Sequence, residues 1–491
     1  MRSRRIPLGG LLATALLVSG CTVGPNYHRP TAPTAPAFKE SAVVPPPDLP
    51  AGGWKQVTPS DSAMRPNWWE IYQDPQLNKL EEQVAVSNQT LKASYEQYMQ
   101  ARAAIQFYRS QYYPTVQVGP SATRERQSQN RPLYVPGSKS TYNDLFLQGQ
   151  VSWEPDLWGS VRRQVESQRA TTQATAADLA NVDLSLRSEL ATDYFELRGL
   201  DTQQRLLDNT VLQYEQFLAL TKARFAGGVA TDSDVALAQT QLDQTRAQAI
   251  DVGVARAQFE HAIATLAGTP ASSFSLSFAP LDLPLPQVPV GVPSQLLERR
   301  PDVAGAERRA NAANAQIGIA IAAYYPTINI SGTGGFESKN ATTLIQGPSS
   351  LWSLGGSAVE LLFDAGRRHA LTEEARAGYE VNVANYRQTV LQAFQEVEDN
   401  LSGLRILNTE SVAQLRAVES ARRSTSISTN RYKGGVTTYL EVITAQTTQL
   451  ANERTAADIT TREFAASVQL IKAIGGGWGG DFSQDCQQDV E

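Results

Sequence analysis

The chain has 491 residues, of which 41% are hydrophobic, 19% are charged and only 8% are aromatic. Its 43 basic and 49 acidic side chains give a formal net charge of −6, and no Lys/Arg stripe is present, which argues against nucleic-acid binding. Three histidines and two cysteines leave little material for catalysis or metal binding. Long stretches rich in Ala, Gln, Thr and Leu favour long helices over a compact enzyme core.

The N-terminal residues have the pattern of an export signal. Arginines at positions 2, 4 and 5 precede an apolar run from Ile6 to Val18, and small residues follow the run. This run is too short to cross a hydrocarbon core of roughly 30 Å as a helix. We therefore predict that residues 1–20 are a secretory signal peptide.

A cysteine follows this signal directly. Residues 18–21, Val-Ser-Gly-Cys, are similar to a bacterial lipobox, which predicts lipidation of Cys21; plain signal cleavage with a free Cys21 is the alternative. Thr22 follows in place of the Asp that retains many lipoproteins in the inner membrane, so this resemblance points to the outer membrane. The other cysteine, Cys486, lies in a polar tail at 475–491. A lipidated Cys21 excludes an intramolecular disulfide between the two.

The mature chain begins with an extended segment and contains no long apolar helix. Residues 22–66 include ten prolines, so we expect the segment 21–66 to be extended along the surface. No later stretch supplies 18 consecutive apolar residues, which predicts that no helix crosses a membrane. If the chain crosses one, it must do so by a closed β-barrel.

The rest of the chain is a tandem repeat. A 17-residue motif that begins at Arg224 returns at Arg431, 207 residues later, with nine identical positions. Tyr-Tyr-Pro at 112–114 returns at 324–326 in the same way. We therefore divide the chain into a first repeat at 67–267, a Pro-rich connector at 268–300 and a second repeat at 301–474.

Each repeat is expected to contain a helix followed by two strands. In the first repeat a helix near 79–112 ends before Pro114, because proline disfavours helix at the preceding residue. Alternating apolar and polar side chains then predict two strands. The strands are expected at about 114–126 and 141–153, and at about 327–336 and 351–363 in the second repeat.

Very long helical hairpins follow the strands. Apolar side chains recur at helical spacing through proline-free stretches, which predicts antiparallel hairpins at about 158–267 and 366–474. At 1.5 Å per residue, about 65 residues make a rod of roughly 100 Å, longer than a compact domain needs. The fold class is therefore α+β, with long hairpins and four strands.

The repeated motif supplies the turn of each hairpin. Gly227 and Gly228, like Gly434 and Gly435, can adopt the left-handed conformation that ends a helix. The chain then continues into the second helix of the hairpin.

Acidic residues stand at the start of that second helix. Thr231 and Thr438 are suited to cap it, and Asp234 and Glu441 lie three residues on, as in a capping box. One interpretation is that these acids only cap helices. The other is that oligomerisation gathers them, with Asp232, into rings that favour cations.

Four strands per chain also require several copies. Even small membrane barrels need about eight strands, so other copies of the chain must supply the remainder. The sequence thus predicts a hollow assembly of more than one copy.

Four stretches carry a resemblance to a known family. The chain resembles the TolC-like outer-membrane factors, and specifically the lipoprotein channels that serve resistance-nodulation-division multidrug pumps. The resemblance covers essentially the whole mature chain. Its residues are the lipidated start at 21–30, the Trp68-Trp69 pair, the Leu-Leu-Glu-Arg-Arg-Pro-Asp stretch at 296–302 with its continuation to 309, and the Gly-Gly-Gly-Trp end at 475–478.

The resemblance implies a homotrimer. Twelve strands, four from each copy, would form an outer-membrane β-barrel above a periplasmic α-barrel of helices, girdled by a mixed equatorial domain. A periplasmic adaptor and an inner-membrane pump would dock on the closed tips and open them. The duct itself would need no ATP, metal or other cofactor.

The same resemblance assigns candidate site residues. Leu440 corresponds to an apolar ring of the gate and Tyr432 to a tyrosine near the tip, with Glu441, Asp234 and Asp232 as acidic candidates. Thr444 stands where the family often has an Asp. The tips expected to meet the adaptor comprise Arg224, Gly227, Gly228, Val229, Thr231, Arg431, Gly434, Gly435, Val436 and Thr438.

Other functional classes explain fewer features. The exit duct of a type I protein secretion system has the same plan, but the lipobox and the 296–309 stretch favour drug efflux. A structural coiled-coil lipoprotein accounts for the long helices only. An enzyme would need a clustered polar site, and His28, His261 and His369 share no catalytic or metal-binding spacing.

Overall fold

The computed structural model describes residues 22–33, 35, 37–40, 67–132, 135, 137, 139–288 and 300–476. The predictions for the signal peptide, for Cys21, for residues 41–66 of the N-terminal segment, for residues 289–299 of the connector and for the tail beyond 476 fall outside the described residues. The chain divides into two compact units. The strand unit comprises Met1–Thr31, Tyr98–Thr175 and Ala306–Tyr386, and the hairpin unit comprises Ala32–Gln97, Ala176–Gly305 and Arg387–Glu491.

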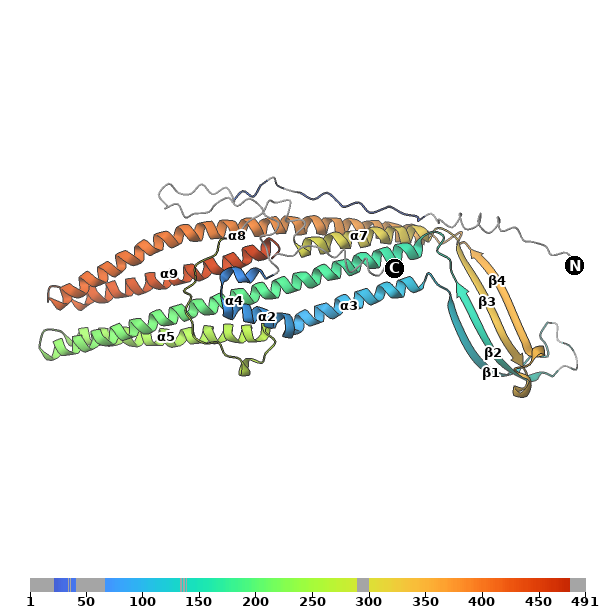
Figure 1. The fold of residues 1–491 in the computed structure, drawn as a ribbon, viewed down its shortest axis with the longest axis horizontal. Coiled ribbons are helices and arrows are strands. Elements are labelled where there is room, and N and C mark those ends of the chain that lie inside the picture. The colour runs from blue at the N-terminus through green and yellow to red at the C-terminus, as the bar shows by residue number, and fades with distance from the viewer. Residues whose placement is uncertain are drawn as a thin grey trace. The chain divides into compact units, whose positions relative to one another are not determined.

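The strand unit contains one antiparallel sheet whose strands follow in chain order (Figure 1). Its strands are β1 (Thr115–Arg126), β2 (Thr141–Trp153), β3 (Thr327–Ser338) and β4 (Ser350–Val359). The pairing of β2 with β3 joins the two repeats in one sheet. Four strands were expected, but the last is shorter than the predicted 351–363. Val359 pairs with Thr327, the first residue of β3, so residues after 359 have no partner on that strand.

Aromatic side chains fix the junction between helices and strands in this unit. Trp153 Nε1 donates to the Tyr112 carbonyl oxygen at 3.0 Å, and Trp158 Nε1 donates to the Pro326 carbonyl oxygen at 2.8 Å. The Trp158 ring also stacks on Tyr325 at a centroid distance of 4.9 Å. Tyr325 therefore packs at this junction, whereas Tyr113 is 71% exposed.

The helix expected near 79–112 is two helices, α2 (Pro75–Ser87) and α3 (Gln89–Ser110). The break is at Asn88, whose backbone is extended with ψ of 122°. Its Oδ1 accepts from the Leu91 amide at 2.9 Å, and its Nδ2 donates to the Leu266 carbonyl oxygen at 2.8 Å. The prediction of one continuous helix was wrong because a side-chain contact with a distant helix end decides the break.

The long helices have equal lengths in the two repeats. Helices α4 (Ser160–Ala226) and α8 (Arg367–Lys433) have 67 residues each, and α5 (Asp232–Leu266) and α9 (Tyr439–Ala473) have 35 each. Helices α3 and α7 (Pro301–Ala322) both have 22 residues. This agreement establishes the tandem repeat at the level of structure. Among the described residues, no helix combines the length and apolar content needed to cross a bilayer.

Aromatic packing forms the centre of the hairpin unit. The Phe195 ring lies 4.7 Å from both the Tyr72 and the Phe464 rings, and all three side chains are almost fully buried. Tyr72 belongs to a short 3-10 helix, η2 (Trp68–Tyr72), that precedes α2. Burial of large aromatic side chains stabilises such a core strongly.

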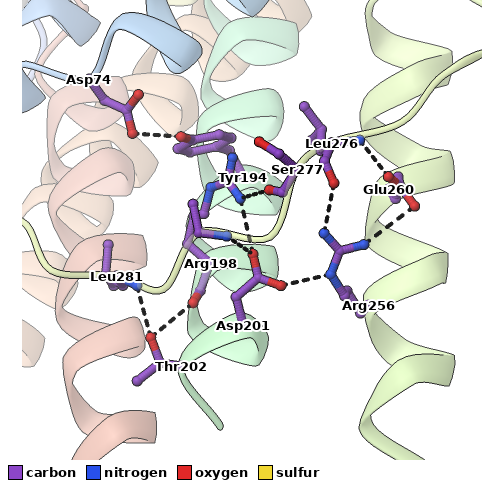
Figure 2. Close-up of polar contacts among 11 residues, drawn as sticks. Asp74, Tyr194, Arg198, Asp201, Thr202, Arg256, Glu260, Leu276, Ser277 and Leu281 are labelled. Carbon is purple, nitrogen blue, oxygen red and sulfur yellow. Dashed lines mark hydrogen bonds and ion pairs between the residues drawn. The ribbon is translucent and has the colours of Figure 1, made fainter. Parts of the chain in front are cut away.

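A buried ionic network attaches the connector to the hairpin α4–α5 (Figure 2). Asp201 of α4 is fully buried and accepts from Arg198 at 3.0 Å and from Arg256 of α5 at 2.7 Å. The two arginines also donate to the carbonyl oxygens of Ser277 and Leu276, at 2.8 and 2.9 Å. Glu260 pairs with Arg256 at 3.5 Å and supplies the second negative charge, so this network positions the connector without leaving a charge uncompensated.

Candidate functional site at the hairpin turns

The two hairpin turns, at residues 224–234 and 431–441, have the same backbone. Gly228 and Gly435 both have φ of 74°, the left-handed conformation that glycine favours. The Val229 amide donates to the Arg224 carbonyl oxygen at 2.9 Å, and the Val436 amide donates to the Arg431 carbonyl oxygen at 2.9 Å. Each long helix therefore ends in a Schellman motif, so the backbone of the repeat motif matches the prediction.

The first turn continues into a complete capping box. The Thr231 side chain accepts from the Asp234 amide at 3.2 Å, and the Asp234 carboxylate accepts from the Thr231 amide at 2.9 Å. Two of the amides that the start of a helix leaves unsatisfied are thereby bonded within the turn.

The second turn lacks this box. Thr438 is the N-cap residue of α9, but its side chain makes no capping hydrogen bond. Glu441 lies 3.5 Å from Arg431 instead, and both side chains are about half exposed. The capping box expected at Thr438 and Glu441 was therefore wrong, because a neighbouring arginine engages the Glu441 carboxylate.

Two tyrosines of the second turn are buried inside the chain. Tyr432 and Tyr439 are 3% and 2% exposed, and their ring centroids are 5.6 Å apart. They pack into a cluster formed by both hairpins, here called the tip cluster. Its other buried members are Tyr214, Leu218, Ala238, Leu242 and Val442.

Burial changes the proton affinity of one of these tyrosines. The pKa of Tyr439 is raised, first by burial and then by the neighbouring Tyr214, Tyr432 and Asp234. The negative charge of Asp234, in the first hairpin, thus contributes to the raised pKa of Tyr439 in the second. The sequence identified Tyr432 as a gate residue but gave no indication that it is buried.

Arg224 joins the two hairpins directly. Its guanidinium lies over the Tyr432 ring at 4.7 Å, and its Nη1 donates to the Lys433 carbonyl oxygen at 3.2 Å. The cation–π contact and the hydrogen bond both cross from α4 to α8. Sequence reasoning placed Arg224 among the adaptor contacts and missed this internal role, because the partner lies 208 residues away, at Tyr432.

Leu440 and Glu441 lie on the opposite side of the second hairpin from the tip cluster. Leu440 is 60% exposed, unlike its neighbours Tyr439 and Val442. With Glu441 and Thr444 it lines a groove of about 440 Å³ between α8 and α9. The structure thus brings two of the candidate gate residues together on a surface that one chain leaves open.

The remaining acidic candidates belong to the first hairpin. Asp232 is exposed and Asp234 is partly buried, and Asp234 is bonded within its own turn. Neither lines the groove beside Leu440. Within one chain the structure therefore does not gather the three acids into a single site.

The segment that follows Cys21 contacts the start of α4. Thr22 packs against Gly159, whose φ is 80°, and Arg163 donates to the carbonyl oxygens of Val23 and Gly24 at 3.2 Å each. Tyr27 donates to Glu307 Oε1 at 2.6 Å. Cys21 itself lies outside the described residues, but the chain directly after it is held beside the base of the strands.

The fold and the turns define a class of protein: channel subunits of the outer membrane built from a four-stranded sheet and two long helical hairpins. The chain matches the outer membrane efflux protein family over residues 80–269 and 292–476. It belongs to that family.

Related proteins agree with this assignment. A probable efflux pump outer membrane protein of Pseudomonas putida, SepC, is 29% identical over 474 residues, which cover 96% of this chain and 97% of SepC. The pyoverdine export outer membrane protein OpmQ of Pseudomonas aeruginosa is 29% identical over 428 residues, 86% of this chain and 90% of OpmQ.

Solved structures show the same fold. The outer-membrane channel OprN is 29% identical with a TM-score of 0.84, covering 94% of this chain and 100% of OprN. The CmeC outer membrane channel of Campylobacter jejuni, 22% identical, has a TM-score of 0.87 over 96% of this chain and 98% of CmeC. The chain is thus an efflux channel protein of the outer membrane that extends into the periplasm.

Proposed function

We propose that three copies of this chain form the exit duct of a tripartite efflux pump. The observation that supports the proposal most directly is that the sheet of a single chain has two open edges. Every residue of β1 is exposed, and β1 and β4 are edge strands, each paired on only one side within the described residues. Long exposed edges promote association, and neighbouring copies would pair with both of them.

Exposed apolar side chains on the sheet support the same proposal. Val116, Val118, Trp352 and Leu354 are 68% to 82% exposed in a single chain. In water such a surface is a liability, whereas in a lipid bilayer it is stabilising. Three copies would supply twelve strands, four from each, and close the sheet.

The N-terminal segment supports a lipid anchor at Cys21. Thr22 is held beside Gly159, at the start of α4 and near the strands. A lipid on Cys21 would therefore enter the membrane next to the base of the strands of its own chain.

The groove beside Leu440 supports a gate at the second turn. In the trimer, three Leu440 side chains would close the duct by contact, and the acidic residues Glu441, Asp234 and Asp232 would favour cations. Tyr432 would act from within the chain, because its packing in the tip cluster fixes the position of the turn that carries Leu440.

The exposed turns suit docking of a periplasmic adaptor. Val229 and Val436 are 67% and 71% exposed at the ends of the hairpins, so an adaptor could bury both. An inner-membrane pump of the resistance-nodulation-division type would supply energy and select the solutes, which we take to be drugs or other toxic small molecules. A structural coiled-coil lipoprotein would leave the sheet unexplained.

Single-channel recording in a planar lipid bilayer tests the proposal. The native chain should give discrete, cation-preferring steps, and Leu440→Ala should give larger ones because the side chain that narrows the duct is shortened. Leu415→Ala is the matched control, since Leu415 is 59% exposed on α8 and lies outside the groove. Silence from the native chain and from Leu440→Ala, with a correctly assembled oligomer, would contradict the channel; an unchanged conductance in Leu440→Ala would remove Leu440 from the gate.

A further inference from the structure

A basic depression lies in the strand unit where α3, α4 and α7 meet. Its volume is about 510 Å³, and it is lined by residues from the end of α3, the first turns of α4 and the middle of α7. Four of the lining residues are arginines, namely Arg109, Arg162, Arg169 and Arg308, and Glu166 is the single acid among them. Neither the candidate gate nor the hairpin turns involve any of these side chains.

The acidic groups nearby do not neutralise this depression. Glu166 is already engaged by Arg163, which lies outside the lining, at 2.7 Å. Arg162 pairs with Asp156 at 3.2 Å and Arg308 pairs with Glu307 at 3.3 Å. Arg169 is exposed and makes no hydrogen bond or ion pair with the described part of the chain. Arg169 therefore leaves at least one positive charge in the depression without an acidic partner.

Three of the arginines line the depression together with Tyr112. Arg109, Arg162 and Arg169 all act electrostatically on the Tyr112 hydroxyl, where their charges oppose the effects of burial and Asp156, which raise its pKa. On the wall formed by α7, Asn311 Oδ1 is buried and has no hydrogen-bond partner within the described residues. Arginines that line one depression together with an unsatisfied polar atom are suited to a ligand with phosphate oxygens and a polar substituent.

The position of the depression indicates where this ligand comes from. Tyr112 and Tyr113 line it, and β1 begins two residues after Tyr113, at Thr115. Figure 1 shows that α3 leads directly into β1. This inference rests on the proposed function, in which β1 enters the outer membrane at Thr115. The depression then faces the headgroup layer of the periplasmic leaflet, which consists of phospholipids.

We propose that this depression binds the phosphate headgroup of an anionic glycerophospholipid of the periplasmic leaflet. Arg169 and Arg308 contact the phosphate, and Asn311 accepts a hydrogen bond from the headgroup. Basic pockets next to membrane-spanning segments recognise anionic lipids through such charge-assisted contacts. The lipid would occupy the space between α3 and α7 and hold the junction in place.

Native mass spectrometry tests the site on the full-length channel from which bound phospholipid has been removed. Phosphatidylglycerol and phosphatidylcholine with identical acyl chains are titrated separately, with and without inorganic phosphate. The native chain should bind phosphatidylglycerol more tightly, and Arg169→Gln and Arg308→Gln should each weaken this binding roughly fivefold. Arg169→Lys should retain most of the affinity. Arg376→Gln is the control, because Arg376 is exposed on α8 and pairs with Glu373 at 2.7 Å.

Each outcome is decisive. Equal affinity for the two lipids, or no change in Arg169→Gln and Arg308→Gln, would overturn the site. Displacement of phosphatidylglycerol by inorganic phosphate at similar concentration would show a site for free phosphate and overturn the lipid assignment. Conductance is recorded on the same preparations: normal channel steps without lipid preference defeat this inference alone, whereas absence of a channel defeats the proposed function.

Discussion

The two hairpin turns share a backbone and differ in what stabilises them. Both end a 67-residue helix with a glycine at φ of 74°. The first turn then closes with the capping box of Thr231 and Asp234, whereas the second has no capping bond from Thr438. The first turn is therefore stabilised by residues close in sequence, and the second by contacts with the other hairpin.

Equivalent positions make this difference clear. Phe225 is 47% exposed, but Tyr432, 207 residues later, is 3% exposed. Asp232 is exposed, but its equivalent Tyr439 is buried. A turn that depends on tertiary contacts can be displaced by breaking those contacts, while a turn stabilised by its own hydrogen bonds retains its shape. The second turn, which carries Leu440, is thus the one suited to move.

The largest expected effect is from Tyr432→Ala. It removes a fully packed ring from the tip cluster and should lower the local free energy of opening of the second turn by about 3 to 5 kcal/mol. Phe225→Ala is the equivalent change in the first turn. It should lower the local free energy of opening of that turn by less than about 1 kcal/mol. Hydrogen exchange of residues 430–442 and 223–235 measures the free energy of opening of the second and the first turn, respectively. Tyr432→Phe should be nearly neutral, because the Tyr432 hydroxyl has no partner among the described residues.

Arg224→Gln should act across the two hairpins. Loss of the contact with the Tyr432 ring and of the hydrogen bond to Lys433 should loosen the second turn by roughly 1 to 2 kcal/mol, although the change is made in the first. Arg431→Gln, which breaks an exposed pair with Glu441, should cost less than about 1 kcal/mol. Hydrogen exchange at 430–442 compares them. Equal effects of the two changes would contradict the dependence of the second turn on Arg224.

Thr231→Ala should have a smaller effect, confined to the first turn. It removes one half of the capping box and should destabilise the start of α5 by about 1 kcal/mol. Thr438→Ala should change the start of α9 by only a few tenths of that amount, because its side chain makes no capping bond. Exchange rates of the first four amides of α5 and α9 provide the measurement. If Thr438→Ala destabilised the start of α9 as much as Thr231→Ala destabilises the start of α5, the two turns would be capped alike.

Glu441→Gln should leave stability almost unchanged and alter selectivity. Its pair with Arg431 is half exposed, and such pairs contribute only about 0 to 1 kcal/mol. If Glu441 faces the duct, the reversal potential in a salt gradient should show a weaker preference for cations. Asp232→Asn tests the other exposed acidic candidate without the loss of capping that Asp234→Asn would cause, since Asp234 caps α5. An unchanged reversal potential in Glu441→Gln would limit Glu441 to pairing with Arg431.

Local patterns allowed much of the fold to be predicted. Alternation placed the four strands, and the repeated Gly-Gly pair located both turns, because β-strand period and left-handed glycine depend on neighbouring residues. The break at Asn88 was missed because its stabilising hydrogen bond joins it to Leu266, at the end of α5. The capping box at Thr438 was predicted wrongly because Arg431 engages Glu441.

By itself, the sequence determined the tandem repeat, the lengths of the hairpins and the glycine turns, since each of these follows from residues close together in the chain. Only the tertiary structure decided which tyrosines are buried in the tip cluster, that Arg224 reaches Tyr432, and that four arginines surround one depression below the strands. The physical reason is distance along the chain. Burial and charge depend on which segments pack together, and in this protein those segments are often about 200 residues apart, as Arg224 and Tyr432 are.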